Sequence, residues 1–155
     1  MTDQTVTHST FAIERHYPAP PERVFAAFSD KARKRRWYAE GREIEQFEMD
    51  FRVGGTDIAR LRMGPSTPFP GTELVYRTTY QDIVANRRLT YAYTLSFAGK
   101  IVSASLVTFE FVAADGGTEV LFTEQGAYFQ GADGPEMREQ GWRGLLEKLA
   151  ASLKD

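Results

Sequence analysis

The chain has 155 residues, of which 42% are hydrophobic and 13% aromatic, so it can bury a substantial core and we expect one globular domain. Its 19 basic and 21 acidic residues give a formal net charge of -2, which argues against a dedicated nucleic-acid-binding protein, so no nucleic-acid partner is expected. Cysteine is absent, which excludes disulfide frameworks, thiol nucleophiles and Cys-ligated metal sites.

The N-terminal segment carries no visible targeting signal. Its first twenty residues lack the apolar stretch of a secretory leader, and no apolar run of the chain approaches the length that spans a bilayer. We therefore expect a cytoplasmic protein without stable membrane insertion. Residues 1–9 are expected to form a flexible tail, and residues 10–155 a single domain that opens with a strand over Thr10–Tyr17.

Two short helices are predicted after this strand. Prolines at 18, 20 and 21 end the strand, and Pro21 suits the first turn of a helix. The apolar residues of Glu22–Phe28 then fall on one helical face. Ser29 or Asp30 can cap a second helix over Lys31–Tyr38.

The middle of the chain predicts a run of antiparallel strands. Residues alternate between apolar and polar most clearly in Leu89–Phe97, and glycine-rich turns such as Asp115-Gly116-Gly117 separate neighbouring segments. The six expected strands are Ile44–Arg52, Ile58–Met63, Thr72–Val84, Leu89–Phe97, Val102–Val112 and Thr118–Tyr128.

The C-terminal segment Gly134–Leu153 predicts one long amphipathic helix. Its apolar stripe consists of Trp142, Leu145, Leu146, Leu149 and Leu153. Arg138 and Arg143 are assigned to its polar remainder. Gly141 and Gly144 weaken the helix by roughly 1 kcal/mol each, and close approach of another group to the helix backbone is one explanation for them.

A run of strands followed by one helix indicates an α+β fold in which the helix covers one face of an antiparallel sheet. A strongly curved sheet around an amphipathic helix can leave a hollow between the two layers.

Several short motifs carry a resemblance that spans nearly the whole chain. The first is ERHYPAPPERVFAAF at residues 14–28. Further motifs follow in order: Arg36-Trp37-Tyr38, Phe51-Arg52-Val53-Gly54-Gly55, Gly71, Arg88-Leu89-Thr90-Tyr91, Gly117-Thr118-Glu119-Val120 and Gly141-Trp142. Together they resemble the START-like (SRPBCC, helix-grip) superfamily, and within it the branch named after the C-terminal domain of the activator of Hsp90 ATPase.

The resemblance implies a curved sheet of six or seven strands wrapped around the C-terminal helix, with a cavity beneath that helix. It does not choose a function, because the superfamily includes lipid and sterol carriers, hormone binders, polyketide cyclases and co-chaperone domains. The sequence departs from the branch at two positions: Asp57 stands where an aromatic residue is common, and Phe25 where tryptophan is frequent.

The inward aromatic side chains indicate either a filled core or an apolar pocket with a few polar groups. Tyrosine hydroxyls need partners when buried, which favours the pocket. We expect the ligand-binding residues to be Trp37 near the mouth, together with Leu61, Met63, Tyr91, Tyr93, Phe109, Trp142 and Leu145.

No catalytic residue, metal site or cofactor is predicted. His8 and His16 have no ligand partner at metal spacing, and Glu48 and Asp50 are interpreted as solvated charges. We identify no compelling inward-facing carboxylate or histidine.

The leading hypothesis is therefore a non-enzymatic domain that binds a small hydrophobic or amphipathic molecule. A polyketide cyclase-like enzyme using the same cavity is the second hypothesis, and it requires a titratable group of perturbed pKa in the pocket. An Hsp90 co-chaperone-like interaction domain is the third and least favoured, because no separate N-terminal domain precedes this one. Exposed strand edges could support a homodimer, although nothing in the sequence requires it.

Overall fold

The computed structural model describes residues 5–154 as seven strands and three helices, in the order expected from the sequence. The elements are β1 (Thr7–Tyr17), α1 (Pro21–Ser29), α2 (Lys31–Tyr38), β2 (Glu43–Glu48), β3 (Thr56–Arg62), β4 (Glu73–Val84), β5 (Arg88–Phe97), β6 (Lys100–Ala114), β7 (Gly117–Tyr128) and α3 (Pro135–Ser152).

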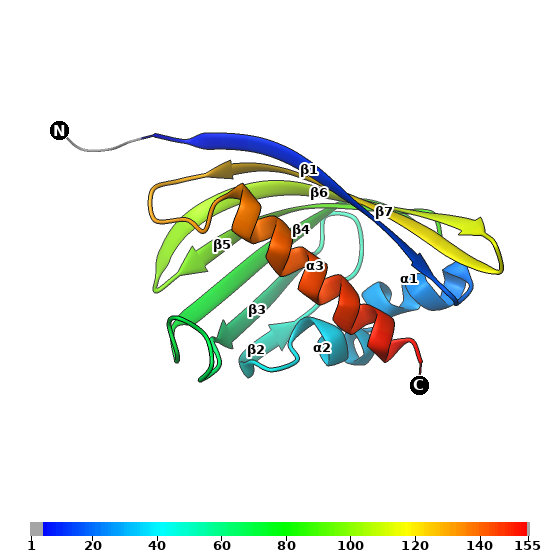
Figure 1. Cartoon of the computed structure of the whole chain (residues 1–155), viewed down its shortest axis with the longest axis horizontal. Helices are drawn as coiled ribbons and strands as arrows, with labels where there is room; N and C mark the ends of the chain where they lie inside the picture. The colour runs from blue at the N-terminus through cyan, green and yellow to red at the C-terminus, as the bar shows by residue number, and fades with distance from the viewer. Residues whose placement is uncertain (1–4, 155) are drawn as a thin grey trace.

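All seven strands form one antiparallel sheet in the order β1-β7-β6-β5-β4-β3-β2. The sheet curves, and α3 runs diagonally across its concave face (Figure 1). Helices α1 and α2 lie near the C-terminal end of α3, so they cover one end of the concave face and leave the other end to α3 alone. The α+β helix-grip prediction is confirmed.

Strand β1 begins at Thr7, three residues before the expected start at Thr10. Thr7, His8 and Ser9 pair with Tyr128, Ala127 and Gly126 of β7, so these three residues belong to the sheet rather than to the expected tail. Thr5 and Val6 precede the strand, and residues 1–4 of that expected tail lie outside the described residues.

Strand β2 ends at Glu48, four residues before the expected end at Arg52. A turn replaces the missing part of the strand, because the Arg52 amide donates to the Asp50 carbonyl at 3.0 Å. Gly55 closes this turn, and a Cβ atom there would lie 2.2 Å from the Asp50 carbonyl oxygen. Only glycine fits such a close approach of two backbone segments.

Helix α2 begins at Lys31, as predicted, because Asp30 caps it. The Asp30 carboxylate accepts hydrogen bonds from the amides of Ala32 and Arg33 at 2.9 and 3.2 Å. Such a cap satisfies amides that have no partner inside the helix, and it contributes about 1 kcal/mol.

The core under α1 and α2 is filled by aromatic side chains. Phe28 of α1 packs against Phe109 of β6 with ring centroids 4.6 Å apart, and against Trp37 of α2 at 5.2 Å. Trp37 also donates its indole N–H to the Ala27 carbonyl at 2.9 Å. Burying each of these rings stabilises the fold by roughly 1.5–3 kcal/mol, so this end of the molecule anchors the two short helices.

None of the helices within residues 5–154 combines the length and the apolar character needed to cross a membrane.

Candidate functional site

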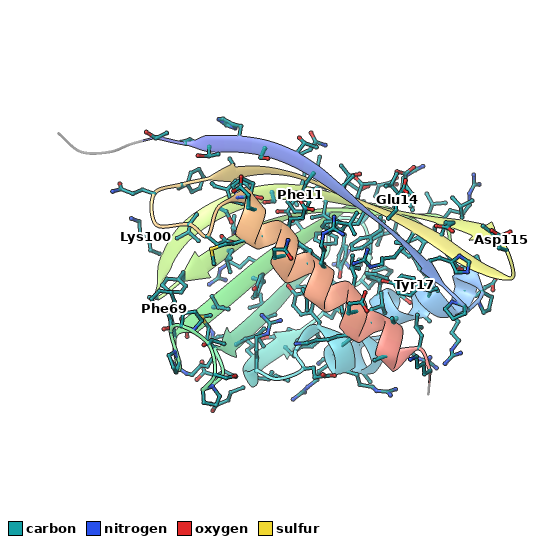
Figure 2. All side chains as sticks on the ribbon, viewed as in Figure 1. Phe11, Glu14, Tyr17, Phe69, Lys100 and Asp115 are labelled. Atoms are coloured by element: carbon teal, nitrogen blue, oxygen red, sulfur yellow. The ribbon has the colours of Figure 1, made fainter. Side chains whose placement is uncertain are left out.

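The concave face is hollow where α3 is its main cover, beyond the end of α2, whose last residue Tyr38 borders the hollow. A pocket of about 600 Å³ lies there, between α3 and strands β4 and β5. Its apolar wall includes Met63, Leu74, Leu95, Phe97, Val102 and Leu145. Phe69, in the loop between β3 and β4, lines its rim and is exposed. Figure 2 shows this residue at the opposite end of the molecule from Tyr17, whose hydroxyl donates to the Leu146 carbonyl in the filled core.

Four of the eight expected ligand-binding residues line this pocket, namely Met63, Tyr93, Trp142 and Leu145. The other four, Trp37, Leu61, Tyr91 and Phe109, are buried in the core and do not border it. The predicted residues therefore do face inward. The inward face of a single strand, however, extends from the filled core into the pocket, so facing inward does not by itself place a residue at the pocket. On β5, Tyr91 packs on Phe109 at 6.3 Å in the filled region, whereas Tyr93, two residues later, reaches the pocket.

Gly141 and Gly144 of α3 border the pocket. No heavy atom outside the helix's own nearby backbone lies within 4 Å of the place where a Cβ atom would stand at either glycine. The sequence suggested that another group approaches the helix backbone here. The structure has open space instead, and the two glycines enlarge it.

A buried ionic cluster forms one end of the pocket. Glu124 of β7 has 0% exposure, and its carboxylate lies 3.5 Å from a guanidinium nitrogen of Arg138. The same carboxylate accepts hydrogen bonds from Tyr93 Oη at 2.8 Å, Trp142 Nε1 at 2.9 Å and Tyr128 Oη at 3.1 Å. Three of these partners, Tyr93, Trp142 and Arg138, line the pocket and separate Glu124 from it.

Arg138 is buried, which corrects its assignment to the polar side of the helix. Its guanidinium forms an ion pair with Asp133 at 2.7 Å and donates to Tyr93 Oη at 2.9 Å and Ser103 Oγ at 2.8 Å. Two carboxylates, Asp133 and Glu124, thus compensate the positive charge of Arg138. A buried arginine persists because these partners replace its lost water.

Burial raises the pKa of Glu124, while Arg138 and the hydroxyl and indole donors oppose that rise. Burial also raises the pKa of Tyr93 well above its ordinary value, with the charge of Glu124 adding to the effect. Tyr93 therefore remains a neutral hydroxyl. The expectation that no carboxylate faces inward was wrong, because Glu124 continues the buried positions of Val120 and Phe122 along β7.

Two other cations line the pocket at its opposite end. Arg42 donates to Tyr76 Oη at 3.3 Å and to the Tyr38 carbonyl oxygen, and its guanidinium lies over both tyrosine rings. Lys148 donates to the Glu40 carbonyl oxygen at 2.9 Å. Both side chains are half-buried, and neither forms an ion pair with a carboxylate of residues 5–154.

A second buried carboxylate belongs to the filled region. Asp57 accepts hydrogen bonds from Tyr80 Oη and, at 3.0 Å, from the Asp50 amide, and it lies 3.4 Å from Lys34 Nζ. Burial lowers the pKa of Lys34, and Asp57 opposes that decrease. The space beside this cluster is only about 10 Å³, too small for a ligand. Asp57 therefore links α2 to the sheet through its ion pair with Lys34.

Among residues 5–154, no group of three or more histidine, aspartate or glutamate side chains could hold a metal ion.

Residues 18–154 match the family described as activator of Hsp90 ATPase homolog 1-like protein. The chain belongs to this family. A comparison with curated proteins gave no match.

Solved structures of similar proteins place this family member in a well-populated fold. The chain is 45% identical to a protein from Rhizobium loti, with 96% of this chain and 99% of that chain covered and a TM-score of 0.86. An uncharacterised protein from Rhizobium leguminosarum is 36% identical, covers 99% of both chains and gives a TM-score of 0.90. A protein from Chromobacterium violaceum is 27% identical over 94% of this chain and 97% of that chain, with a TM-score of 0.80.

Proposed function

We propose that the chain binds a small hydrophobic or amphipathic molecule in the pocket between α3 and the concave face of the sheet. The observation that carries this proposal is the hollow of about 600 Å³ with a mainly apolar wall. Small-ligand sites are usually concave, mostly apolar and of roughly 300–1,000 Å³, with a few polar groups that orient the ligand. Met63, Tyr93, Trp142 and Leu145 are proposed to contact the ligand, whereas Trp37, Leu61, Tyr91 and Phe109 support the wall from behind.

A cavity-filling variant tests this proposal. Gly144→Leu places four carbon atoms where an added Cβ meets open space, and it removes a glycine from a helix interior, so we expect a protein at least as stable as the wild type. The neutral fluorescent probe N-phenyl-1-naphthylamine should bind the wild type saturably and lose most of its binding to Gly144→Leu. Equal binding to both proteins would overturn the proposal.

The matched control is Arg143→Leu, at the next position of the same helix. Arg143 forms a partly buried ion pair with Glu139 at 2.8 Å and does not line the pocket. This variant should bind the probe as the wild type does. Native mass spectrometry of gently purified protein, with extraction of any bound molecule, would then identify the ligand.

An enzyme acting on a carbonyl compound, similar to polyketide cyclases, is the second candidate function. The observation that favours it is the array of Glu124, Tyr93 and Arg138 at one end of the pocket. A protonated Glu124 can donate to Tyr93 Oη, which frees the hydroxyl proton of Tyr93 to polarise a carbonyl oxygen in the pocket.

Deuterium exchange at the α-carbon of the hydrophobic ketone 2-decanone, followed by NMR in heavy water, tests this second candidate. Exchange faster than in buffer, and lost in Tyr93→Phe, would support an enzyme. Exchange that matches buffer, or that persists in Tyr93→Phe, would reject this role for the array. A homodimer, a chaperone partner and a cytoplasmic location stay predictions.

A further inference from the structure

The pocket is electrostatically asymmetric along α3. At one end, the positive charge of Arg138 is compensated by ion pairs with Asp133 at 2.7 Å and Glu124 at 3.5 Å. At the other end, Arg42 and Lys148 donate only to neutral oxygens. Arg138 and Lys148 are ten residues apart on the helix, which corresponds to roughly 15 Å along its axis. The pocket therefore joins a neutralised end to a positively charged end.

Arg42 and Lys148, which form no ion pair with a carboxylate of residues 5–154, belong to one site. Lys148 Nζ donates to the Glu40 carbonyl and lies 3.9 Å from where a Cβ atom of Gly41 would stand, and Arg42 is the next residue. Both side chains line the pocket. A guanidinium has five N–H donors and an ammonium three, so most of their donors remain free. Because both groups are half-buried, part of their hydration is already lost, which favours an oxyanion as partner.

Between the two ends the wall is apolar, formed by side chains such as Leu74, Leu95, Phe97 and Leu145. We infer that the occupant of the pocket is an anionic amphiphile, whose carboxylate binds beside Arg42 and Lys148 and whose apolar body extends along the wall toward Trp142. This inference rests on the proposed ligand-binding function and adds the chemical class of the ligand. A cationic amphiphile is disfavoured, because its head would meet two positive charges and no carboxylate lines this end of the pocket within the described residues.

Three probes with the same twelve-carbon chain separate head-group charge from apolar binding: dodecanoate, 1-dodecanol and dodecyltrimethylammonium. Their dissociation constants are measured by displacement of N-phenyl-1-naphthylamine at neutral pH, below the concentrations at which they form micelles. Dodecanoate should bind about tenfold or more tightly than dodecanol, since hydrogen bonds to charged groups contribute more than neutral ones. Dodecyltrimethylammonium should bind most weakly.

The double variant Arg42→Met/Lys148→Met should bind dodecanoate and dodecanol almost equally, and its retained dodecanol binding demonstrates that the pocket is intact. Arg42→Gln/Lys148→Gln is used if the methionine variant does not fold. The matched control Arg143→Met/Lys154→Met removes the same residue types and the same net charge, outside the pocket lining. It should keep the preference for dodecanoate.

The outcomes distinguish the two proposals. Equal binding of dodecanoate and dodecanol to the wild type would overturn the anionic ligand but leave the binding function standing. Binding of none of these probes, nor of N-phenyl-1-naphthylamine, would overturn both. A preference that survives in the Arg42/Lys148 double variant, or that is lost equally in the control, would overturn the assignment to these two cations.

Discussion

The two ends of the concave face are built from the same strands but are packed in opposite ways. At the end under α1 and α2, Phe28 and Phe109 lie 4.6 Å apart, and the space beside Asp57 measures only about 10 Å³. At the other end, α3 is the main cover and only Tyr38, the last residue of α2, reaches the edge, and a hollow of about 600 Å³ remains. The residues facing inward are large and apolar at both ends. The number of covering elements, rather than side-chain size on the sheet, therefore decides where the fold is hollow.

The buried charges follow the same division. At the filled end, Asp57 pairs with Lys34 beside a space too small for a ligand. At the hollow end, the partners of Glu124 form part of the pocket wall. A cluster of similar chemistry can thus fasten a helix in one place and shape a binding surface in another.

The largest expected difference between the two ends is the cost of removing an aromatic ring. Phe109→Ala should lower the free energy of unfolding by about 3–5 kcal/mol, because it leaves a cavity in a tightly packed region. Phe97→Ala removes the same ring from the pocket wall, where the residue is only partly buried. We expect a much smaller loss for Phe97→Ala, since one side of its ring already faces open space.

Guanidinium chloride denaturation of both variants measures this difference. Equal losses would mean that the hollow end is as tightly packed as the filled end, in contradiction to the pocket geometry. Retained N-phenyl-1-naphthylamine binding by Phe109→Ala in the absence of denaturant would separate the core's contribution to stability from any contribution to ligand contact.

Replacing the two arginines of the pocket should distinguish a paired cation from an unpaired one. Arg138→Met leaves Glu124 buried without its cation, which should cost about 3–5 kcal/mol. Arg42→Met removes hydrogen bonds to two neutral oxygens, and we expect a loss of less than about 1 kcal/mol. Thermal denaturation of the two variants compares them directly. A larger loss of unfolding free energy for Arg42→Met than for Arg138→Met would contradict the assignment of Arg138 as the ion-paired arginine and Arg42 as the arginine without an ion pair.

The sequence predicted the fold closely, because periodicity and turn chemistry report local backbone structure. Asp30 as a cap and the alternation of β5 are examples in which the local pattern was sufficient. The same alternation predicted which face of β5 is buried, but it could not separate Tyr91 from Tyr93, since both face inward and the boundary of the hollow falls between them.

The charged residues of the site were missed for a related reason. A carboxylate at an inward position interrupts an apolar pattern and suggests that the pattern ends. Glu124 nevertheless follows Val120 and Phe122 in the same period of two, and Arg138 precedes Trp142 by four residues, about one helical turn. These spacings were the available signals. Arg42 lies in a loop, where no periodicity applies.

Added atoms should be tolerated differently at the two ends. Ala27→Leu introduces three carbon atoms into the packed region and should cost about 1–3 kcal/mol. Gly141→Ala adds one carbon where nothing lies within 4 Å, and the better helix propensity of alanine should raise stability by up to about 1 kcal/mol. Denaturation midpoints measure both effects. A destabilised Gly141→Ala would mean that the space beside α3 is occupied.

The smallest effect concerns the pH dependence of stability at the hollow end. Burial raises the pKa of Glu124 above its ordinary value of 4.5. At a pH between 4.5 and the raised pKa of the folded state, folded Glu124 holds a proton that the unfolded state has released, so increasing pH favours unfolding.

Glu124→Gln lacks this titrating carboxyl group, while the other titrating groups are common to both proteins. The free energy of unfolding of the wild type minus that of the variant should therefore fall as pH rises from about 4.5 toward the raised pKa. Denaturant titrations at a series of pH values measure it. A difference that rises with pH would mean that Arg138 and the donors of Tyr93, Trp142 and Tyr128 stabilise the carboxylate more than burial penalises it.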